Sequence, residues 1–291
     1  MMKTINILII TLTIILLNAC ALTKPSEKKE TIKTEQVSVA FRNVQTSKAL
    51  FYNADILFSA HDMAALPVIF YMSQIEKKGQ NVFSKSVTLT NEFSSTLNNE
   101  IYLIPEKEQA FQADRILKID ALCIESVGGD VFASETLIRL FEPEKIAESL
   151  KQIDARGVMV LSGNFDPATL KINLSNKVTA FGLLNIVTAM QDSSWTLDSR
   201  QNWFKLNLMN AIKSEDFELD NEVTVQGHLY SKGTEHIFFA RVQGVNQEDF
   251  DVVILLNHFP SQEKADEKLK SILKQLVQYH KGDILSQSIH F

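Results

Sequence analysis

Short stretches in which apolar and polar residues alternate lie near both ends of the chain. Close to the N-terminus, residues 37–41 (VSVAF) and 49–58 (ALFYNADILF) fit strands separated by a polar turn. Three further stretches of this kind fall between residues 222 and 258, with turn-forming residues at 231–233 (SKG) and 246–247 (NQ) between them. The sequence therefore predicts strands at both ends of the folded part.

The middle of the chain has apolar residues at helical spacing. Residues 62–77 are mostly apolar and are followed by Gly79, which predicts a helix hidden inside the protein. Pro143 and Gly157 suit the first turn and the end of a second helix. Including these two, we expect helices over residues 62–77, 134–141, 143–156, 179–191, 198–213 and 261–280, and a short extended piece at 86–92.

This order of elements predicts the fold class. Strands at both ends with helices between them indicate an α/β (more narrowly α+β) fold, in which one antiparallel sheet is built from both chain ends and packed with helices. Residues 37–60 and about 220–291 would form the sheet part of a domain spanning 37–291. Residues from about 61 to 219 would form an inserted, all-helical subdomain.

The first residues have the layout of a secretory signal peptide: Lys3, an apolar run too short for a comfortable membrane span, and then small residues. The run ends in Leu17-Asn18-Ala19-Cys20, which resembles the lipobox of bacterial lipoproteins. That resemblance implies removal of residues 1–19, a diacylglycerol on the Cys20 thiol and a fatty acyl chain such as palmitate on its amine. Because Ala21 rather than aspartate follows, it also favours the outer membrane. An uncleaved N-terminal anchor is the alternative.

Residues 20–36 would then be the lipidated cysteine and a flexible tether, because this segment is polar and charged without an apolar period. Cleavage removes Lys3 alone among the charged residues, so the formal net charge changes from −6 to −7. A chain without a basic surplus cannot neutralise phosphates, and we expect no nucleic acid partner. Cys123 lies in an apolar stretch and is expected to be a small buried side chain.

The stretch YNADILFSAHDMAALPV (residues 52–68) follows the pattern x-N-A-x-x-x-F-x-x-A-S-x-x-K-x-P-V at its asparagine, first alanine, phenylalanine, proline and valine. On this stretch and on the order of elements, residues 37–281 resemble the penicillin-recognising serine hydrolases, in particular the class A β-lactamases and related D,D-peptidases. In that family the stretch leads into a buried central helix. The nucleophilic serine lies at the helix tip, and a lysine follows one turn later.

The resemblance places Asp62 in the serine position and Ala65 in the lysine position, counting back from Pro67. Acyl transfer needs a hydroxyl that is activated by a nearby base, and these two residues supply neither. Losing both groups costs on the order of a millionfold in turnover in a comparable hydrolase. Asp62 also suits the N-cap of the predicted helix.

The other two motifs of the family are incomplete as well. The Ser-Asp-Asn motif is represented by Gly129, Asp130 and Val131, so only its aspartate remains. The Lys-Thr-Gly motif is represented by His228, Leu229 and Tyr230. The resemblance allows a histidine for that lysine, whereas Leu229 and Tyr230 would remove a hydroxyl and fill space that the ligand needs.

No other catalytic pattern stands out. There is no Gly-x-Ser-x-Gly, no glycine-rich phosphate loop and no His-Glu-x-x-His, and the histidines show no ligand spacing, so we expect no metal and no cofactor. Asp166 is the one carboxylate between residues 157 and 179, where the glutamate that deacylates β-lactamases would be sought. Ser-x-x-Lys recurs, at the frequency expected by chance and without a following proline, at Ser26–Lys29, Ser261–Lys264 and Ser271–Lys274.

These features predict an envelope-anchored lipoprotein with a β-lactamase-like fold that has lost its catalytic motifs. Its domain would face the periplasm or the cell surface and would bind an envelope protein or a peptidoglycan fragment. The alternative is a hydrolase that acts on peptidoglycan-derived peptides through a rearranged acid–base site of Asp62, His61 and either His228 or Asp130. An open cleft shared by these residues would favour the hydrolase, and side chains that plug the cleft would favour the binding protein.

Overall fold

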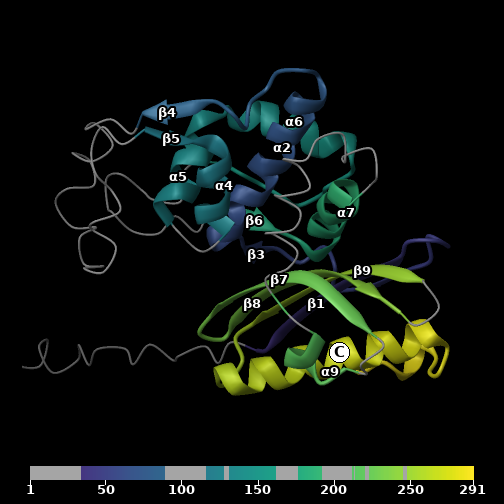
Figure 1. The fold of residues 1–291 in the computed structure, drawn as a ribbon. Helices are drawn as coiled ribbons and strands as arrows, with labels where there is room; N and C mark the ends of the chain where they lie inside the picture. The colour runs from purple at the N-terminus through teal and green to yellow at the C-terminus, as the bar shows by residue number, and fades with distance from the viewer. Residues whose placement is uncertain are drawn as a thin grey trace, which may run out of the picture. The chain divides into compact units, whose positions relative to one another are not determined.

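The sheet predicted from the alternating stretches is present and is built from both ends of the chain (Figure 1). It is antiparallel, has five strands and follows the order β2-β1-β9-β8-β7. The strands are β1 (Gln36–Asn43), β2 (Ala49–Tyr52), β7 (Thr224–Lys232), β8 (Glu235–Gln243) and β9 (Asp249–Asn257). The predicted fold class, an antiparallel sheet packed with helices, is confirmed.

The computed structural model describes residues 34–88, 116–127, 131–161, 176–191, 212, 214–219, 223–244 and 248–291. Within it, Glu35–Phe291 form one structural unit. The predicted signal peptide, the turn at 246–247 and nearly all of the helix predicted over 198–213 lie outside the described residues. No helix in the described part is long and apolar enough to cross a membrane.

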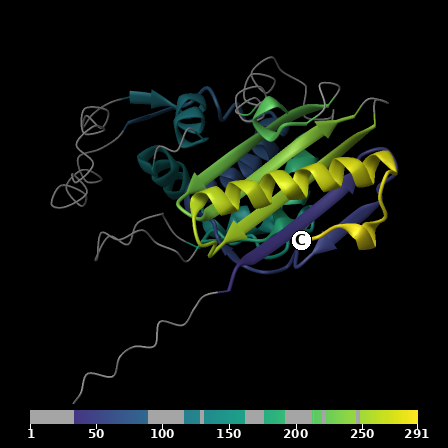
Figure 2. The same ribbon diagram turned by 90° about the horizontal axis from the view of Figure 1, so that it is seen from below.

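Strand β8 shows that the sheet is covered on both faces. Its side chains alternate between two apolar cores, with Ile237 and Phe239 in one and Phe238 and Ala240 in the other. Helix α9 (Gln262–Lys281) lies across the strands on the second of these faces (Figure 2). Because β8 is buried on both sides, its run of apolar residues is almost continuous.

Helices α4 to α7 pack around α2 on the other face of the sheet (Figure 1). Helix α2 is buried from its first residue through Phe70 and contacts the four helices α4 to α7, while α7 also contacts β1, β8 and β9. The bounds are η1 (His61–Ala64), α2 (Ala65–Lys77), α4 (Ile119–Val127), α5 (Val131–Leu140), α6 (Pro143–Gln152), α7 (Ala180–Gln191), η5 (Ser214–Phe217) and η6 (Ser286–Ser288). Two short ladders accompany them: β3 (Phe58–Ser59) with β6 (Lys177–Val178), and β4 (Ser86–Thr88) with β5 (Ile116–Lys118).

Side-chain hydroxyls cap the first turns of two helices. The hydroxyl of Thr179 accepts a hydrogen bond from the backbone N–H of Gly182 at 3.0 Å, in the first turn of α7. The hydroxyl of Ser261 accepts from the backbone N–H of Lys264 at 3.2 Å, in the first turn of α9. Each bond satisfies an N–H group that has no partner within its own helix.

Two boundaries differ from the expectation. Helix α2 begins at Ala65, because the 3₁₀ turn η1 precedes it, and its cap residue is Ala64; Asp62 is therefore not its N-cap. Helix α6 starts at Pro143 as predicted but ends at Gln152, well before Gly157. Gly157 has a φ of 75° in a later turn, where a Cβ atom would lie 2.2 Å from the Thr179 side chain.

A buried polar cluster fastens α7 to the sheet. Arg241 on β8 binds Asp251 on β9 through two hydrogen bonds, from Nε to Oδ1 at 2.8 Å and from Nη2 to Oδ2 at 2.9 Å. Thr188 on α7 donates its hydroxyl to the same Oδ2 at 2.9 Å. Asp251 is fully buried, so the charged and hydrogen-bonded partners are what make its burial tolerable.

Candidate functional site

The tip of α2 is the place where the resemblance puts the catalytic serine and lysine. Ala65 is the first residue of α2 and is 2% exposed, inside the apolar core of the helical face. Pro67 falls in the first helical turn, where a missing backbone N–H breaks no hydrogen bond. Asp62 belongs to η1; its side chain lies outside the described part of the structure. The position matching the lysine therefore holds a buried methyl group.

His61, directly before Asp62, has its own contacts at this tip. Its φ of 45° lies in the left-handed region, which costs a non-glycine residue about 1–3 kcal/mol and persists only where surrounding contacts hold it. The imidazole stacks on the ring of Tyr230 with centroids 5.6 Å apart and planes 21° from parallel. Its Nε2 also lies against a carboxylate oxygen of Glu235. These contacts join η1 to the β7–β8 hairpin.

Strand β7 carries the three residues that stand for the Lys-Thr-Gly motif. His228 stacks on Phe239, and Tyr230 packs against the same helical-face core. Leu229 packs in the core beneath α9 instead. Side chains alternate along a strand, so Leu229 cannot share a cleft with its two neighbours. The expectation that Leu229 fills ligand space is wrong, whereas Tyr230 does face the helix tip through His61.

His228 is a buried neutral imidazole. It is 8% exposed, and its Nδ1 is buried without a hydrogen-bond partner among the described residues. Burial lowers its pKa to about 4, because an imidazolium would lose its hydration there. At neutral pH the position that matches the family's lysine therefore carries no positive charge.

The Ser-Asp-Asn position is described only at its last residue. Gly129 and Asp130 lie outside the described residues, and Val131 opens α5. Nearby, the hydroxyls of Ser126 and Ser134 lie 2.8 Å apart and join α4 to α5 in a buried contact.

Cys123 is buried as predicted. Burial raises the pKa of its thiol, and the nearby Asp120 carboxylate adds to the rise. The thiolate is the nucleophilic form of cysteine, so this thiol is inert at neutral pH.

The two described Ser-x-x-Lys pairs have structural roles. Ser261 is the N-cap of α9, and the Lys264 ammonium pairs with Glu267 at 2.7 Å on the helix surface. Ser271 accepts a hydrogen bond from the Gln275 side chain, and Lys274 pairs with Glu218 at 2.8 Å. In neither pair does the lysine ammonium bind the serine hydroxyl, as activation of a nucleophile would require.

A Ser–His–Asp contact that the sequence analysis missed lies between the β7–β8 hairpin and α9. Ser231 Oγ is 3.2 Å from His236 Nδ1, and His236 Nε2 is 2.7 Å from Asp266 Oδ1. Hydrolases use this order of groups, but they also need donors aimed at the reacting carbonyl oxygen. His236 is fully buried, and these two partners satisfy both of its ring nitrogens, so we assign the contact a structural role.

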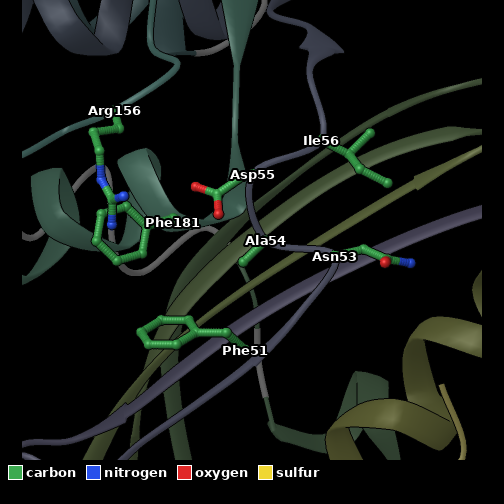
Figure 3. A pocket seen from close by; sticks show the side chains of 7 residues that line it. All are labelled: Phe51, Asn53, Ala54, Asp55, Ile56, Arg156 and Phe181. Atoms are coloured by element: carbon green, nitrogen blue, oxygen red, sulfur yellow. The ribbon is translucent and has the colours of Figure 1, made fainter.

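A pocket of about 520 Å³ lies at the loop between β2 and β3 (Figure 3). The Arg156 guanidinium carbon lies 4.2 Å from the centre of the Phe181 ring, and the Phe51 and Phe181 rings are 5.4 Å apart. The lining residues are Phe51, Asn53, Ala54, Asp55, Ile56, Arg156 and Phe181. None of the predicted site residues is among them. Within the described residues, no group of three or more His, Cys, Asp or Glu side chains could hold a metal ion.

Comparison with known proteins defines the class of this fold. The structure resembles PBP-A with a TM-score of 0.68 and 10% identity, covering 87% of this chain and 92% of that one. It resembles a β-lactamase from Burkholderia vietnamiensis with a TM-score of 0.67 and 14% identity (85% and 92% covered), and one from Sphaerobacter thermophilus with 0.63 and 11% (86% and 93% covered).

The chain thus has the fold of the penicillin-recognising serine hydrolases, as the sequence resemblance predicted. Neither protein-family models nor curated proteins match it. At identities this low the likeness establishes the fold and leaves the activity open.

Proposed function

We propose that this protein is a lipid-anchored envelope protein with a β-lactamase-like scaffold that binds a protein or a peptidoglycan fragment and does not hydrolyse it. The observation that carries the proposal is Ala65. A methyl group that is 2% exposed stands where the resemblance requires a proton-accepting lysine. No base at that position can activate a nucleophile at the helix tip.

The neighbouring contacts support a non-catalytic role. The ring of Tyr230 stacks on His61 at the same helix tip, and the imidazole of His228 is buried and neutral. A general base in a rearranged acid–base site works best when its pKa lies near the pH at which the enzyme acts. A pKa of about 4 makes His228 a poor base, since its conjugate acid gives up the proton too readily.

The anchoring part of the proposal rests on the lipobox-like ending at Cys20. It is tested by growing cells with a clickable fatty acid and comparing wild type with Cys20→Ser and Cys123→Ala. Wild type and Cys123→Ala should be labelled, because the buried Cys123 thiol is not an acceptor, and Cys20→Ser should not. Equal labelling of Cys20→Ser would refute lipidation at this residue.

Loss of catalysis is tested with the mature protein in detergent. Intact-mass spectra after incubation with benzylpenicillin should show no adduct, and muropeptides should be recovered uncleaved. An adduct that persists in Asp62→Ala would mean that the nucleophile lies elsewhere. Cleavage that depends on His61 or His228 would favour the rearranged hydrolase instead.

The binding role is tested by capture from detergent-solubilised envelope with the mature protein as bait, and by titration calorimetry with purified muropeptides. We expect one specific ligand from these two sources. Saturable binding without turnover supports the proposal, and the absence of both kinds of ligand would refute it.

A further inference from the structure

Hydrogen bonds hold the pocket at the loop between β2 and β3 against the start of α7. The backbone N–H of Phe181, in the first turn of α7, donates to the carbonyl of Ala54 in that loop at 3.0 Å. The hydroxyl of Thr179, directly before α7, donates to the backbone carbonyl of Arg156 at 2.5 Å. Because these bonds form within the folded chain, the pocket is largely preformed, and little ordering opposes the entry of a ligand.

Two side chains of opposite charge line the pocket and do not pair with each other. Arg156 covers one face of the Phe181 ring, and its Nε lies 3.2 Å from Asp154 Oδ1. Within the described residues, neither terminal nitrogen of the Arg156 guanidinium makes a hydrogen bond, and the Asp55 carboxylate has no partner. Figure 3 shows this carboxylate pointing toward the side of the pocket where Arg156 lies. A donor fork and an acceptor of opposite charge are thus available to a ligand.

An exposed aromatic ring supplies apolar surface beside these charges. Phe51 is 46% exposed, although its ring centre lies only 5.4 Å from that of Phe181. Figure 3 shows both rings on the same side of the loop as the Arg156 guanidinium. A large aromatic side chain that stays half exposed at a pocket offers a contact surface to the apolar part of a ligand.

We propose that this pocket binds the stem peptide of a peptidoglycan fragment, the short peptide that is attached to the glycan and carries free carboxylates and a free amino group. The inference rests on the proposed function, from which it selects the peptidoglycan fragment as the ligand and to which it adds a site. The Arg156 fork donates to a carboxylate of the peptide, and the Asp55 carboxylate accepts from the amino group. The Phe51 ring covers aliphatic carbons of the peptide.

Charge and size together select this class of ligand. A simple anion would be repelled by Asp55 and a simple cation by Arg156, whereas a stem peptide presents both charges on a short aliphatic frame. The volume of about 520 Å³ falls within the range of about 300–1,000 Å³ that is typical of small-molecule sites. Seven residues line the pocket, compared with about 20–30 on each side of a specific protein interface, so it is too small to hold a protein partner on its own.

The test is titration calorimetry with the mature protein in detergent and a synthetic tetrapeptide of alanine, D-glutamate, diaminopimelate and D-alanine. The variants are Arg156→Met, which keeps an unbranched side chain over Phe181, and Asp55→Asn. Lys264→Met is the matched control, because the Arg156 and Lys264 side chains are each 60% exposed and each is paired with an acidic neighbour. All three substitutions are at exposed positions, so the variants should fold normally.

We expect the tetrapeptide to bind the wild type and Lys264→Met equally. It should bind Arg156→Met about tenfold more weakly or worse, because hydrogen bonds between charged groups are lost. Acetylating the free amino groups of the peptide should weaken binding to the wild type several-fold and change binding to Asp55→Asn little, since the same contact is already missing there. As a measurement that does not depend on variants, a photoreactive tetrapeptide should cross-link to the segments that contain residues 51–56 or Arg156, identified by mass spectrometry.

Each other outcome overturns a distinct statement. Tight binding that Arg156→Met leaves unchanged, with cross-links elsewhere in the chain, refutes this pocket and leaves the proposed function intact. Equal binding of a glycan disaccharide that lacks the peptide refutes recognition of the stem peptide. If neither muropeptides nor the tetrapeptide bind but a protein is captured from the envelope, the inference is wrong and the proposed function stands with a protein ligand. If no ligand of either kind binds, both are wrong.

Discussion

Replacing Ala65 with lysine tests whether the position that matches the family's lysine is closed. Ala65 is 2% exposed at the start of α2 and packs in the core of the helical face. The new side chain would overpack this site at a cost of about 1–3 kcal/mol. Its ammonium would lose water without a described carboxylate beside it, which adds several kcal/mol. We expect a total loss of about 4 kcal/mol or more, a large part of the 5–15 kcal/mol typical of a domain.

Two further variants separate these contributions. Ala65→Met adds bulk without charge and should lose only the overpacking share. Ala147→Lys places the same side chain on the exposed surface of α6 and should cost a few tenths of a kcal/mol, the difference in helix propensity. The free energies of unfolding are measured by urea denaturation followed by circular dichroism.

The pH dependence of the stability of Ala65→Lys tests independently whether the new lysine is buried. Burial lowers the pKa of a lysine, so between the folded and unfolded pKa values the unfolded state binds more protons. Stability relative to Ala147→Lys must then rise with pH in that window, by up to about 1.4 kcal/mol per unit. If the free energies of unfolding of Ala65→Lys and Ala147→Lys differ by less than about 0.5 kcal/mol at pH 7, position 65 is exposed and the placement of α2 is wrong.

Three further predictions test the packing of the sheet. His228→Phe should make stability less sensitive to acid. The pKa of His228 is about 4 in the folded protein and near 6.5 in the unfolded chain, so the wild type should lose up to about 3 kcal/mol of unfolding free energy as the pH falls through that window. Urea denaturation of the variant at several pH values should show no such loss. Arg241→Met should cost about 3–5 kcal/mol by leaving Asp251 buried and unpaired, and adding Asp251→Leu should recover part of it; no recovery would contradict this account. Gly227→Ala should lower the melting temperature, because its Cβ would lie 2.3 Å from the Phe239 carbonyl oxygen; an unchanged temperature would place β7 differently.

Local sequence patterns determined most of the secondary structure. Alternation predicted the strands of the sheet, and the helices expected over residues 179–191 and 261–280 match α7 and α9 to within one residue. Such signals work because strand and helix periodicity and terminal hydrogen bonds depend on residues close in sequence. Helix α4 was not predicted, because its nine residues are apolar on most sides and lack the distinct polar face from which a helical period is recognised.

The replaced residues of the candidate site could also be read from the sequence. The spacing back from Pro67 assigned Ala65 to the lysine position, and the helix that follows is buried as expected. The N-cap assignment of Asp62 failed, because the extra 3₁₀ turn before α2 depends on how His61 is held by Tyr230 and Glu235. Those partners come from a hairpin far along the chain.

What the sequence alone determined is therefore the fold class, with strands at both ends of the folded part and helices between them; the lipid anchor and the replacement of the family's serine and lysine stay predictions. Only the tertiary structure decided which side chains share a face. Strand pairing turned Leu229 toward α9 and Tyr230 toward His61. The physical reason is that the alternating pattern of a strand does not say which of its two faces meets which core. Pairing with strands far away in the sequence decides that.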